Sequence, residues 1–190
     1  MYVSFIIPTN RNQIITLSSI PNDYAVYIQR EKGDYIARNA GIKKAKDGIV
    51  ICCDDDISFS LDFLSDILSL VKPGVLVGLE DYWPSRWCIT RFMAFDKSDW
   101  EKVGGFNETK GWYGGPDTDF CIRMEKAGIK IIRIPRNSVI HHDEEKNLPF
   151  KVNLVDNFWL WKRYPLIMTP IILRLLERKL RMLLKQVMLA

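Results

Sequence analysis

The sequence predicts a layered α/β fold. Up to residue 134, short β-branched and apolar segments alternate with segments of helix-forming composition. The segment Ile49–Cys53 is almost purely apolar, which is typical of a strand covered on both faces. Because strands that alternate with helices pack in layers, we expect a mostly parallel central sheet flanked by helices.

The expected elements follow one another with clear boundary residues. The expected strands share an apolar or β-branched composition: Val3–Ile7, Tyr24–Ile28, Ile49–Cys53, Val75–Leu79, Cys88–Phe95 and Lys130–Ile134. The expected helices each end at a glycine or a proline-glycine pair: Asp34–Lys46, Leu61–Leu70 and Asp117–Ala127. The stretch Val103–Gly115 holds five glycines and three aromatic residues, which predicts a loop.

The end of the chain differs from the rest, since it is basic from Lys162 onward apart from Glu177. We expect one domain over residues 1–150 and a helical, basic, amphipathic extension over residues 151–190. On a helical wheel one face carries Arg174, Arg178, Arg181 and Lys185, and the opposite face carries Leu173, Leu176, Leu180, Leu183 and Val187. Such a helix either packs on the domain with its charged side in water or binds a membrane surface or a partner.

Composition limits the function classes. The formal net charge of +4 is too mild to indicate nucleic-acid binding, so we expect no nucleic-acid partner. The four cysteines form no CxxC pair, and Cys52 and Cys53 are expected on opposite faces of one strand, which disfavours a disulfide. With no signal-peptide pattern and no apolar span long enough for a bilayer, the sequence favours a cytoplasmic location.

An acidic triplet, Asp54 to Asp56, directly follows the apolar strand Ile49–Cys53. The carboxyl ends of strands in open α/β sheets are where ligands bind. Three adjacent carboxylates repel one another and favour a cation, and their oxygens suit magnesium or manganese, which bridge well to a diphosphate. The alternative is a solvated acidic turn before the next helix.

Five segments in order extend this pattern: VSFIIPTNRN (residues 3–12), ARNAGIKKAKDGIVICCDDD (37–56), GGFNE (104–108), GPDTDFCIRMEKAG (115–128) and IPRNSVIHH (134–142). Over roughly the first three-quarters of the chain, the sequence resembles the family-2-like inverting glycosyltransferases of the GT-A fold. The resemblance implies a Rossmann-like nucleotide-sugar-binding fold, with a C-terminal amphipathic helix added in this chain.

The resemblance implies a metal site and a donor site. Asp54 and Asp56 match the ends of the family's DxD motif, so Asp56 is expected to ligate Mn2+ or Mg2+, while Asp54 or Asp55 faces the ribose or the metal's waters. His141, placed ahead of His142 by alignment alone, would complete the metal shell. The positions matched to donor-contacting residues are Pro8, Thr9, Asn10, Arg38 and Asn39.

The resemblance also assigns the acceptor side. Asp117 matches the family's general base, although Pro116 stands where the family usually has Glu, and Asp119 is the fallback for the base or a sugar contact. Trp112 and Tyr113 match the position of the bound sugar, since aromatic faces pack on sugar rings. The competing interpretation is a loop anchored in the core by its aromatic residues.

The implied function is metal-dependent transfer of a sugar, of the hexosyltransferase type, from a UDP-, GDP- or dTDP-sugar to a glycan, lipid-linked or protein-glycan hydroxyl. Relatives have an acidic turn after the second strand that recognises the nucleobase of the donor. Tyr27–Asp34 has no paired acids directly after that strand, so the sequence does not identify the nucleobase. Residues 165–190 are expected to contact the inner face of a membrane peripherally. The alternatives are a nucleotidyltransferase-like phosphoryl-transfer enzyme and a non-catalytic carbohydrate- or membrane-binding module.

Overall fold

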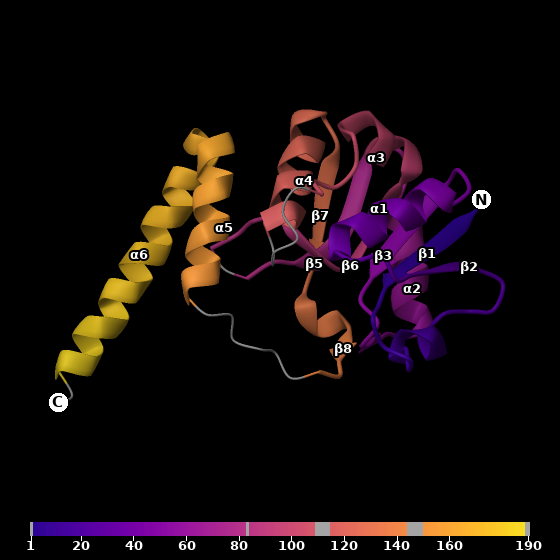
Figure 1. Cartoon of the computed structure of the whole chain (residues 1–190), viewed down its shortest axis with the longest axis horizontal. Helices are drawn as coiled ribbons and strands as arrows, with labels where there is room; N and C mark the ends of the chain where they lie inside the picture. The colour runs from indigo at the N-terminus through magenta and orange to yellow at the C-terminus, as the bar shows by residue number, and fades with distance from the viewer. Residues whose placement is uncertain (1, 83, 109–114, 144–149, 189–190) are drawn as a thin grey trace.

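The computed structural model describes residues 2–82, 84–108, 115–143 and 150–188, the side chains of 150–156 and 182–188 excepted. A six-stranded sheet in the order β2-β1-β3-β6-β5-β7 lies at its centre (Figure 1). Its strands are β1 (Val3–Pro8), β2 (Ala25–Gln29), β3 (Ile49–Cys53), β5 (Val75–Glu80), β6 (Cys88–Asp96) and β7 (Lys130–Ile134). All but β6 run in the same direction, which confirms the predicted mostly parallel sheet.

The reversal of β6 follows from the length of its connection. Only residues 81–87 separate β5 from β6. A parallel crossover needs a dozen or more residues, whereas an antiparallel pair can be joined by a short turn. Strand β6 therefore pairs antiparallel with β5 on one side and with β3 on the other.

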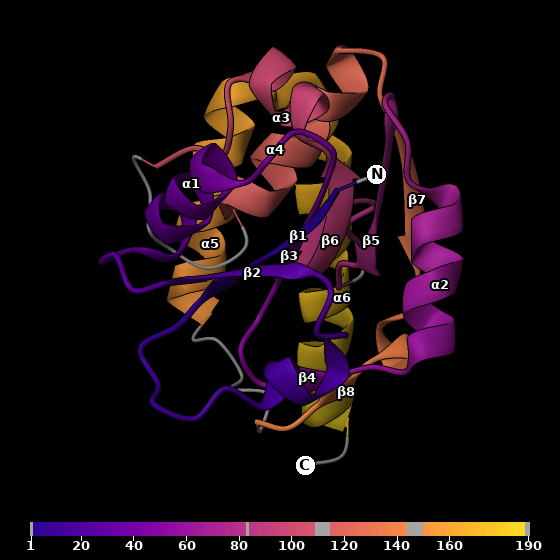
Figure 2. The same ribbon diagram turned by 90° about the vertical axis from the view of Figure 1, so that its right-hand side faces the viewer.

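Helices cover both faces of the sheet (Figure 2). One face carries α1 (Asp34–Lys44), α3 (Lys97–Val103) and α4 (Gly115–Lys126), and the other carries α2 (Leu61–Leu70) and the 3-10 turn η1 (Ile15–Ser19). The sheet separates two apolar clusters, and Cys52 lies in one while Cys53 lies in the other. The predicted opposite orientation of these two cysteines is confirmed, and all four cysteines are buried and free.

Helix α3 was not expected from the sequence. The Asp96 side chain caps its first turn by accepting a hydrogen bond from the backbone N–H of Ser98, and Gly104 ends it with a φ of 78°. These are ordinary helix start and stop signals. They are hard to recognise because the helix spans seven residues between a strand and a glycine-rich loop.

A second, small sheet pairs β4 (Ile57–Ser58) with β8 (Ile140–His141), and the short turn η2 (Arg136–Ser138) precedes β8. Ile57 lies opposite His141 in this pairing. The small sheet therefore brings the chain after β7 back to the end of β3.

The C-terminal extension forms a helical hairpin of α5 (Phe150–Arg163) and α6 (Pro165–Met188), which lie side by side in Figure 1. Leu160, Tyr164, Met168 and Ile171 are buried in the same apolar cluster as Phe120 of α4. Among the described residues, no helix has the length and apolar character that crossing a bilayer requires.

Asn39 ties α1 to the segment after α3. Its Oδ1 accepts hydrogen bonds from the backbone N–H of Phe106 (2.9 Å) and the indole of Trp100 (3.1 Å). Its Nδ2 donates to the carbonyl of Phe106 (2.9 Å) and to Glu108 Oε1 (2.8 Å). The amide is buried, and both its oxygen and its nitrogen make two hydrogen bonds within the protein, so its contacts give Asn39 a structural role.

We predict that Asn39→Ala lowers the free energy of unfolding by about 2–4 kcal/mol, because it leaves the Phe106 N–H and the Trp100 indole buried without acceptors. Urea unfolding followed by circular dichroism measures the change. Lys43→Ala, an exposed substitution on the same helix, is the control and should change stability by less than about 0.5 kcal/mol. Equal stability of the two variants would contradict this role of Asn39.

Candidate active site

The acidic triplet lies at the carboxyl end of β3, as the sequence predicts, and its backbone is held by η1. The hydroxyl of the buried Thr16 donates to the carbonyl of Asp54 (2.7 Å). The backbone N–H of Ile15 donates to the carbonyl of Asp55 (2.9 Å). The main chain of the triplet is thus fixed, and its three side chains are directed to different partners.

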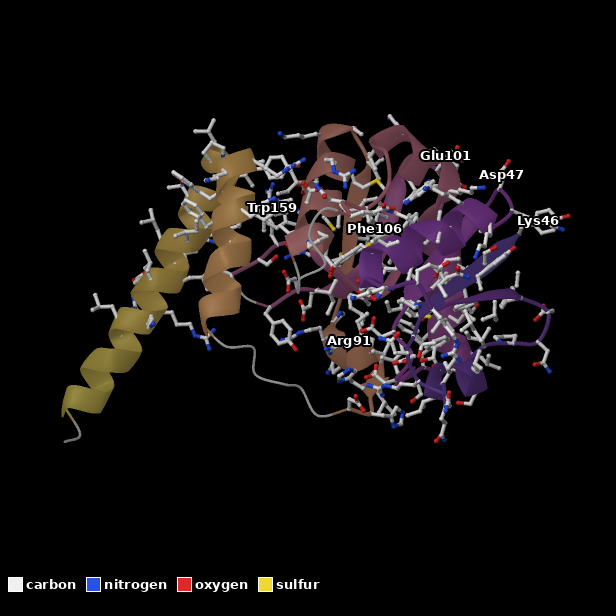
Figure 3. The ribbon with its side chains drawn as sticks, in the orientation of Figure 1. Lys46, Asp47, Arg91, Glu101, Phe106 and Trp159 are labelled. Atoms are coloured by element: carbon white, nitrogen blue, oxygen red, sulfur yellow. The ribbon has the colours of Figure 1, made fainter. Side chains whose placement is uncertain are left out.

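Asp54 is paired with arginines. Arg38 of α1 donates to its carboxylate at 2.6 Å, and Arg91 of β6 lies 4.0 Å from it. Figure 3 shows Arg91 on the side of the domain opposite Lys46, Asp47 and Glu101. The Asp54 carboxylate at the end of β3 therefore lies between two guanidinium groups.

Asp56 and His141 form the best candidate for metal ligation. Pairing of β4 with β8 brings His141 Nε2 to 3.4 Å from Asp56 Oδ2, whereas His142 Nε2 lies 2.9 Å from the Ser58 hydroxyl. Burial and the neighbouring Asp54 raise the pKa of Asp56. Within the described residues, Asp56 Oδ1 and His141 Nδ1 are buried without a hydrogen-bond partner. The geometry thus favours His141 over His142.

These two residues fit a divalent ion that takes its other ligands from elsewhere. In the described part of the chain, no group of three or more His, Cys, Asp or Glu side chains is gathered closely enough to hold a metal alone. Magnesium commonly binds through one or two carboxylates together with phosphates and water. The orphaned oxygen of Asp56 and the adjacent imidazole are consistent with such an incomplete protein shell.

Arg11 is a site residue that the motif comparison missed. Its guanidinium lies 3.7 Å from Asp55 and 3.7 Å from Asp56, and it donates to Asp143. These carboxylates raise the pKa of Arg11. The signal in the sequence was the need of the acidic triplet for a compensating cation, which the loop after β1 supplies.

A pocket of about 250 Å³ opens beside the triplet. The loop after β1 and the segment before α1 line it: Pro8, Thr9, Asn10, Arg11, Glu31, Gly33, Asp34, Ala37 and Asp55. The Thr9 hydroxyl donates to the Asp55 carboxylate. The three loop residues predicted to contact the donor therefore lie together, and Glu31 and Asp34 bring carboxylates to the pocket although none directly follows β2.

Asp117 lies in the first turn of α4 and is 5% exposed. Its carboxylate accepts hydrogen bonds from the backbone N–H (3.2 Å) and the hydroxyl (3.0 Å) of Thr90, and from Tyr35. Burial raises the pKa of Asp117 to about 7, against the opposing effects of Arg38, Tyr35 and Thr90. A carboxylate with a pKa near neutrality is suited to accept and release a proton at physiological pH.

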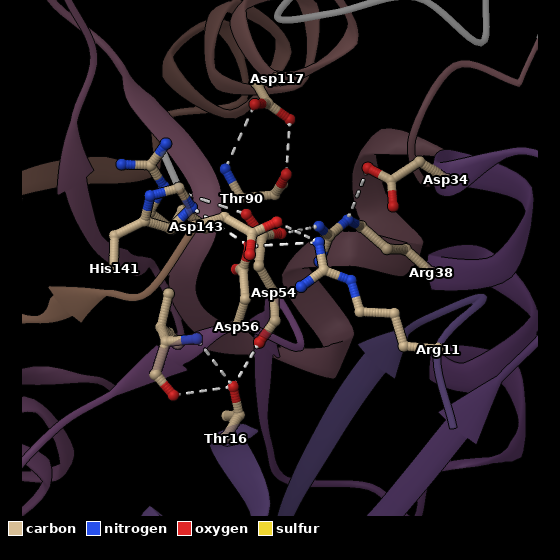
Figure 4. A network of polar contacts seen from close by, with 12 residues as sticks. Arg11, Thr16, Asp34, Arg38, Asp54, Asp56, Thr90, Asp117, His141 and Asp143 are labelled. Carbon is tan, nitrogen blue, oxygen red and sulfur yellow. Dashed lines mark hydrogen bonds and ion pairs between the residues drawn. The ribbon is translucent and has the colours of Figure 1, made fainter. Parts of the chain in front are cut away.

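Arg38 connects the two parts of the site (Figure 4). Its guanidinium is 1% exposed, donates to Asp54 and lies 3.4 Å from Asp34. Its charge also lowers the pKa of Asp117. The triplet and Asp117 thus share one charged environment. The predicted sugar contacts Trp112 and Tyr113 lie outside the described residues.

Asp119 faces away from this environment. Its carboxylate is 0% exposed and accepts from Tyr164 (2.7 Å) and Arg123 (2.9 Å), with Arg163 at 3.2 Å. These contacts bind α4 to the C-terminal hairpin. They give Asp119 an anchoring role, and Asp117 stays the candidate base of this helix.

Sequence comparisons match part of the chain. A family model described as the N-terminal domain of galactosyltransferase matches residues 80–145. The rhamnosyltransferase WbbL of Escherichia coli (strain K12) is 33% identical over 64 residues, which are 34% of this chain and 24% of that protein. The chain thus spans about a quarter of the length of this curated relative.

Structural comparisons cover more of the chain. The mannosyltransferase PcManGT from Pyrobaculum calidifontis, in complex with GDP-Man and Mn2+, has a TM-score of 0.61 at 18% identity, over 76% of this chain and 58% of that chain. A mutant of Drosophila β1,4-galactosyltransferase 7, in complex with manganese, UDP-Gal and xylobiose, has a TM-score of 0.57 at 12% identity, over 82% and 79%. Staphylococcus aureus TarS with UDP-GlcNAc has a TM-score of 0.54 at 11% identity, over 85% and 67%.

At these identities the structural similarity concerns the fold, and the family model matches the segment that contains Asp117 and His141. The chain therefore shares its fold with these glycosyltransferases, and residues 80–145 are similar to the N-terminal domain of galactosyltransferase.

Proposed function

We propose that this protein is a metal-dependent inverting glycosyltransferase that moves a sugar from a nucleotide-diphosphate sugar to an acceptor hydroxyl. The observation that carries the proposal is that the triplet and Asp117 contact adjacent residues of β6, since Thr90 donates to Asp117 and the Arg91 carbonyl accepts from the Asp54 N–H. In this proposal residues 1–150 form the catalytic domain. The similar proteins named above transfer sugars, which favours glycosyl transfer over phosphoryl transfer.

The chemistry assigned to the chain's own residues is a single displacement. Asp117 accepts the proton of the acceptor hydroxyl as its oxygen bonds to the anomeric carbon, and the bond from that carbon to the nucleotide diphosphate breaks with its electron pair leaving on the diphosphate. Attack opposite to the leaving group inverts the configuration. Asp56 and His141 would hold Mn2+ or Mg2+, which supplies Lewis-acid stabilisation of the negative charge on the leaving diphosphate.

The pocket beside Asp55 is assigned to the nucleotide. Backbone and side-chain groups of Pro8, Thr9 and Asn10 line it together with the cationic Arg11. The structural neighbours are complexes with GDP-Man, UDP-Gal and UDP-GlcNAc, which supports a UDP-, GDP- or dTDP-sugar as donor. The acceptor class is a glycan or a lipid-linked hydroxyl.

We predict that Asp117→Asn lowers the rate of nucleotide release from the accepted donor sugar by about 100-fold or more, because the amide cannot take the proton. A panel of nucleotide sugars with manganese is screened with wild type, and the variant is then compared on the donor that reacts. Asp66→Asn, an exposed acid on α2, is the control and should retain wild-type turnover. Full turnover by Asp117→Asn would remove Asp117 from the role of base.

Asp56→Ala should weaken Mn2+ binding by about tenfold or more, because it removes the carboxylate expected to ligate the ion. Isothermal titration with Mn2+ in the presence of the nucleoside diphosphate measures the effect without relying on turnover. The exposed Asp66→Ala is the matched control. If both variants bind Mn2+ as wild type does, the metal is held elsewhere.

The C-terminal hairpin is proposed to rest on an anionic membrane surface. Leu173, Leu176 and Leu180 of α6 are 60%, 52% and 58% exposed, so this leucine face is turned away from the domain, while Met168 and Ile171 pack inward. Exposed basic residues flank the leucines: Arg174, Arg178, Lys179 and Arg181. An apolar stripe bordered by cations is typical of a helix that lies in a membrane interface.

Replacing Leu173, Leu176 and Leu180 by Gln should weaken binding to phosphatidylglycerol-containing vesicles by about tenfold or more, since each leucine loses its transfer free energy into the interface. Vesicle sedimentation measures the affinity, and pure phosphatidylcholine vesicles test the electrostatic part. The control replaces three exposed leucines elsewhere, Leu17, Leu61 and Leu70, by Gln. Equal binding by both triple variants would refute the membrane proposal.

A further inference from the structure

Two residues outside the family motifs, Thr90 and Tyr35, donate hydrogen bonds to the carboxylate of Asp117. We propose that they are positioning residues, which hold this carboxylate in one orientation toward the incoming hydroxyl. The inference rests on the proposed role of Asp117 as general base. It adds residues and a mechanism of orientation that the sequence motifs do not contain.

The hydrogen-bond count supports a fixed orientation. An ionised carboxylate offers about four acceptor positions. Among the described residues, the Thr90 N–H occupies one on Oδ2 and the Thr90 hydroxyl occupies one on Oδ1, and the Tyr35 side chain interacts with the same carboxylate. Since the donors come from β6 and α1 while Asp117 is on α4, rotation of the carboxylate would break bonds to two other elements.

The sheet is built so that Thr90 is available for this contact. The pairing of β5 with β6 is interrupted: Gly78 lies opposite Met93, but the next residue, Leu79, lies opposite Ile89. Residues 90–92 therefore have no partner on β5, and the N–H of Thr90 donates to Asp117 instead. Irregularities of this kind occur next to active sites, where they redirect backbone and side-chain groups.

The same interruption serves the other half of the site. Arg91, the next residue, lies 4.0 Å from Asp54, and its carbonyl accepts a hydrogen bond from the Asp54 N–H. One irregular segment of β6 thus contacts both Asp117 and the triplet. The contacts with Asp117 and Asp54 thus replace the hydrogen bonds to β5 that this segment of β6 does not make.

Tyr35 is buried in an apolar setting. Its ring packs 5.8 Å from that of Phe106, within the cluster on the α1 side of the sheet. A buried hydroxyl needs a partner, and the carboxylate of Asp117 provides it.

Several groups face Asp117 and set the sign of the expected pH effect. Burial raises the pKa of Asp117, and three groups lower it: Arg38 and Tyr35 of α1 and Thr90 of β6. Two buried thiols, Cys52 of β3 and Cys121 of α4, also interact electrostatically with Asp117. A hydrogen bond to the charged form of a carboxylate lowers its pKa, so removing one raises it. Because the base acts when deprotonated, the acidic limb of the rate profile should move to higher pH.

The test is the pH profile of donor turnover in Tyr35→Phe and Thr90→Val. We expect the acidic limb, near pH 7 in wild type, to move upward by about half a pH unit or more in each variant. Thr90→Ser keeps both donors and should restore the wild-type limb. A uniform loss of rate with an unmoved limb in both variants would reduce Thr90 and Tyr35 to structural residues and overturn the inference.

A second readout separates this inference from the proposed function. Carboxyl 13C NMR of Asp-labelled protein follows the titration of Asp117 directly, with Asp117→Asn identifying its resonance. A higher pKa of Asp117 in both variants supports the contacts, and an unchanged pKa in both overturns the inference alone. Retained activity of Asp117→Asn would instead refute the role of the base. Thermal melts confirm that the variants compared are folded.

Discussion

The pairing of the buried Arg38 guanidinium is the constraint on which the site depends. A buried charge is tolerated only when it is paired, and Arg38 satisfies this by contacts with Asp34 and Asp54. The pairing locks α1 against the end of β3. Because the same charge acts on Asp117, it also relates α4 to the triplet. The positive charge of Arg38 thus acts both on the carboxylate expected to serve as base and on the carboxylates expected to face metal and nucleotide.

Two departures from regular sheet structure bring further polar side chains to the site. The antiparallel β6 is interrupted at residues 90–92, which brings Thr90 to Asp117 and Arg91 to Asp54. The short β4–β8 pair returns the chain so that His141 lies beside Asp56. In both cases a small irregular element beside the acidic triplet supplies polar groups that the regular, apolar strands cannot.

Helix α4 joins the site to the C-terminal hairpin. Asp117 and Asp119 are two residues apart, so their side chains point to nearly opposite sides of the helix. One meets Thr90 and Tyr35, and the other is buried against Tyr164 and Arg163. The helix that carries the proposed base is thereby anchored to the helices whose exposed leucines are proposed to meet a membrane. This gives the extension a physical connection to the chemistry.

The sequence by itself determined the local elements and the candidate acids. The bounds of Ile49–Cys53, Leu61–Leu70 and Lys130–Ile134 were predicted as observed, because periodicity, capping residues and glycine stops are local signals. Tertiary structure alone decided the structural use of Asn39, the cation supplied by Arg11 and the contacts of Thr90 and Tyr35 with Asp117. These depend on groups far apart in the chain, and the raised pKa of Asp117 depends on burial, which only the packed structure creates.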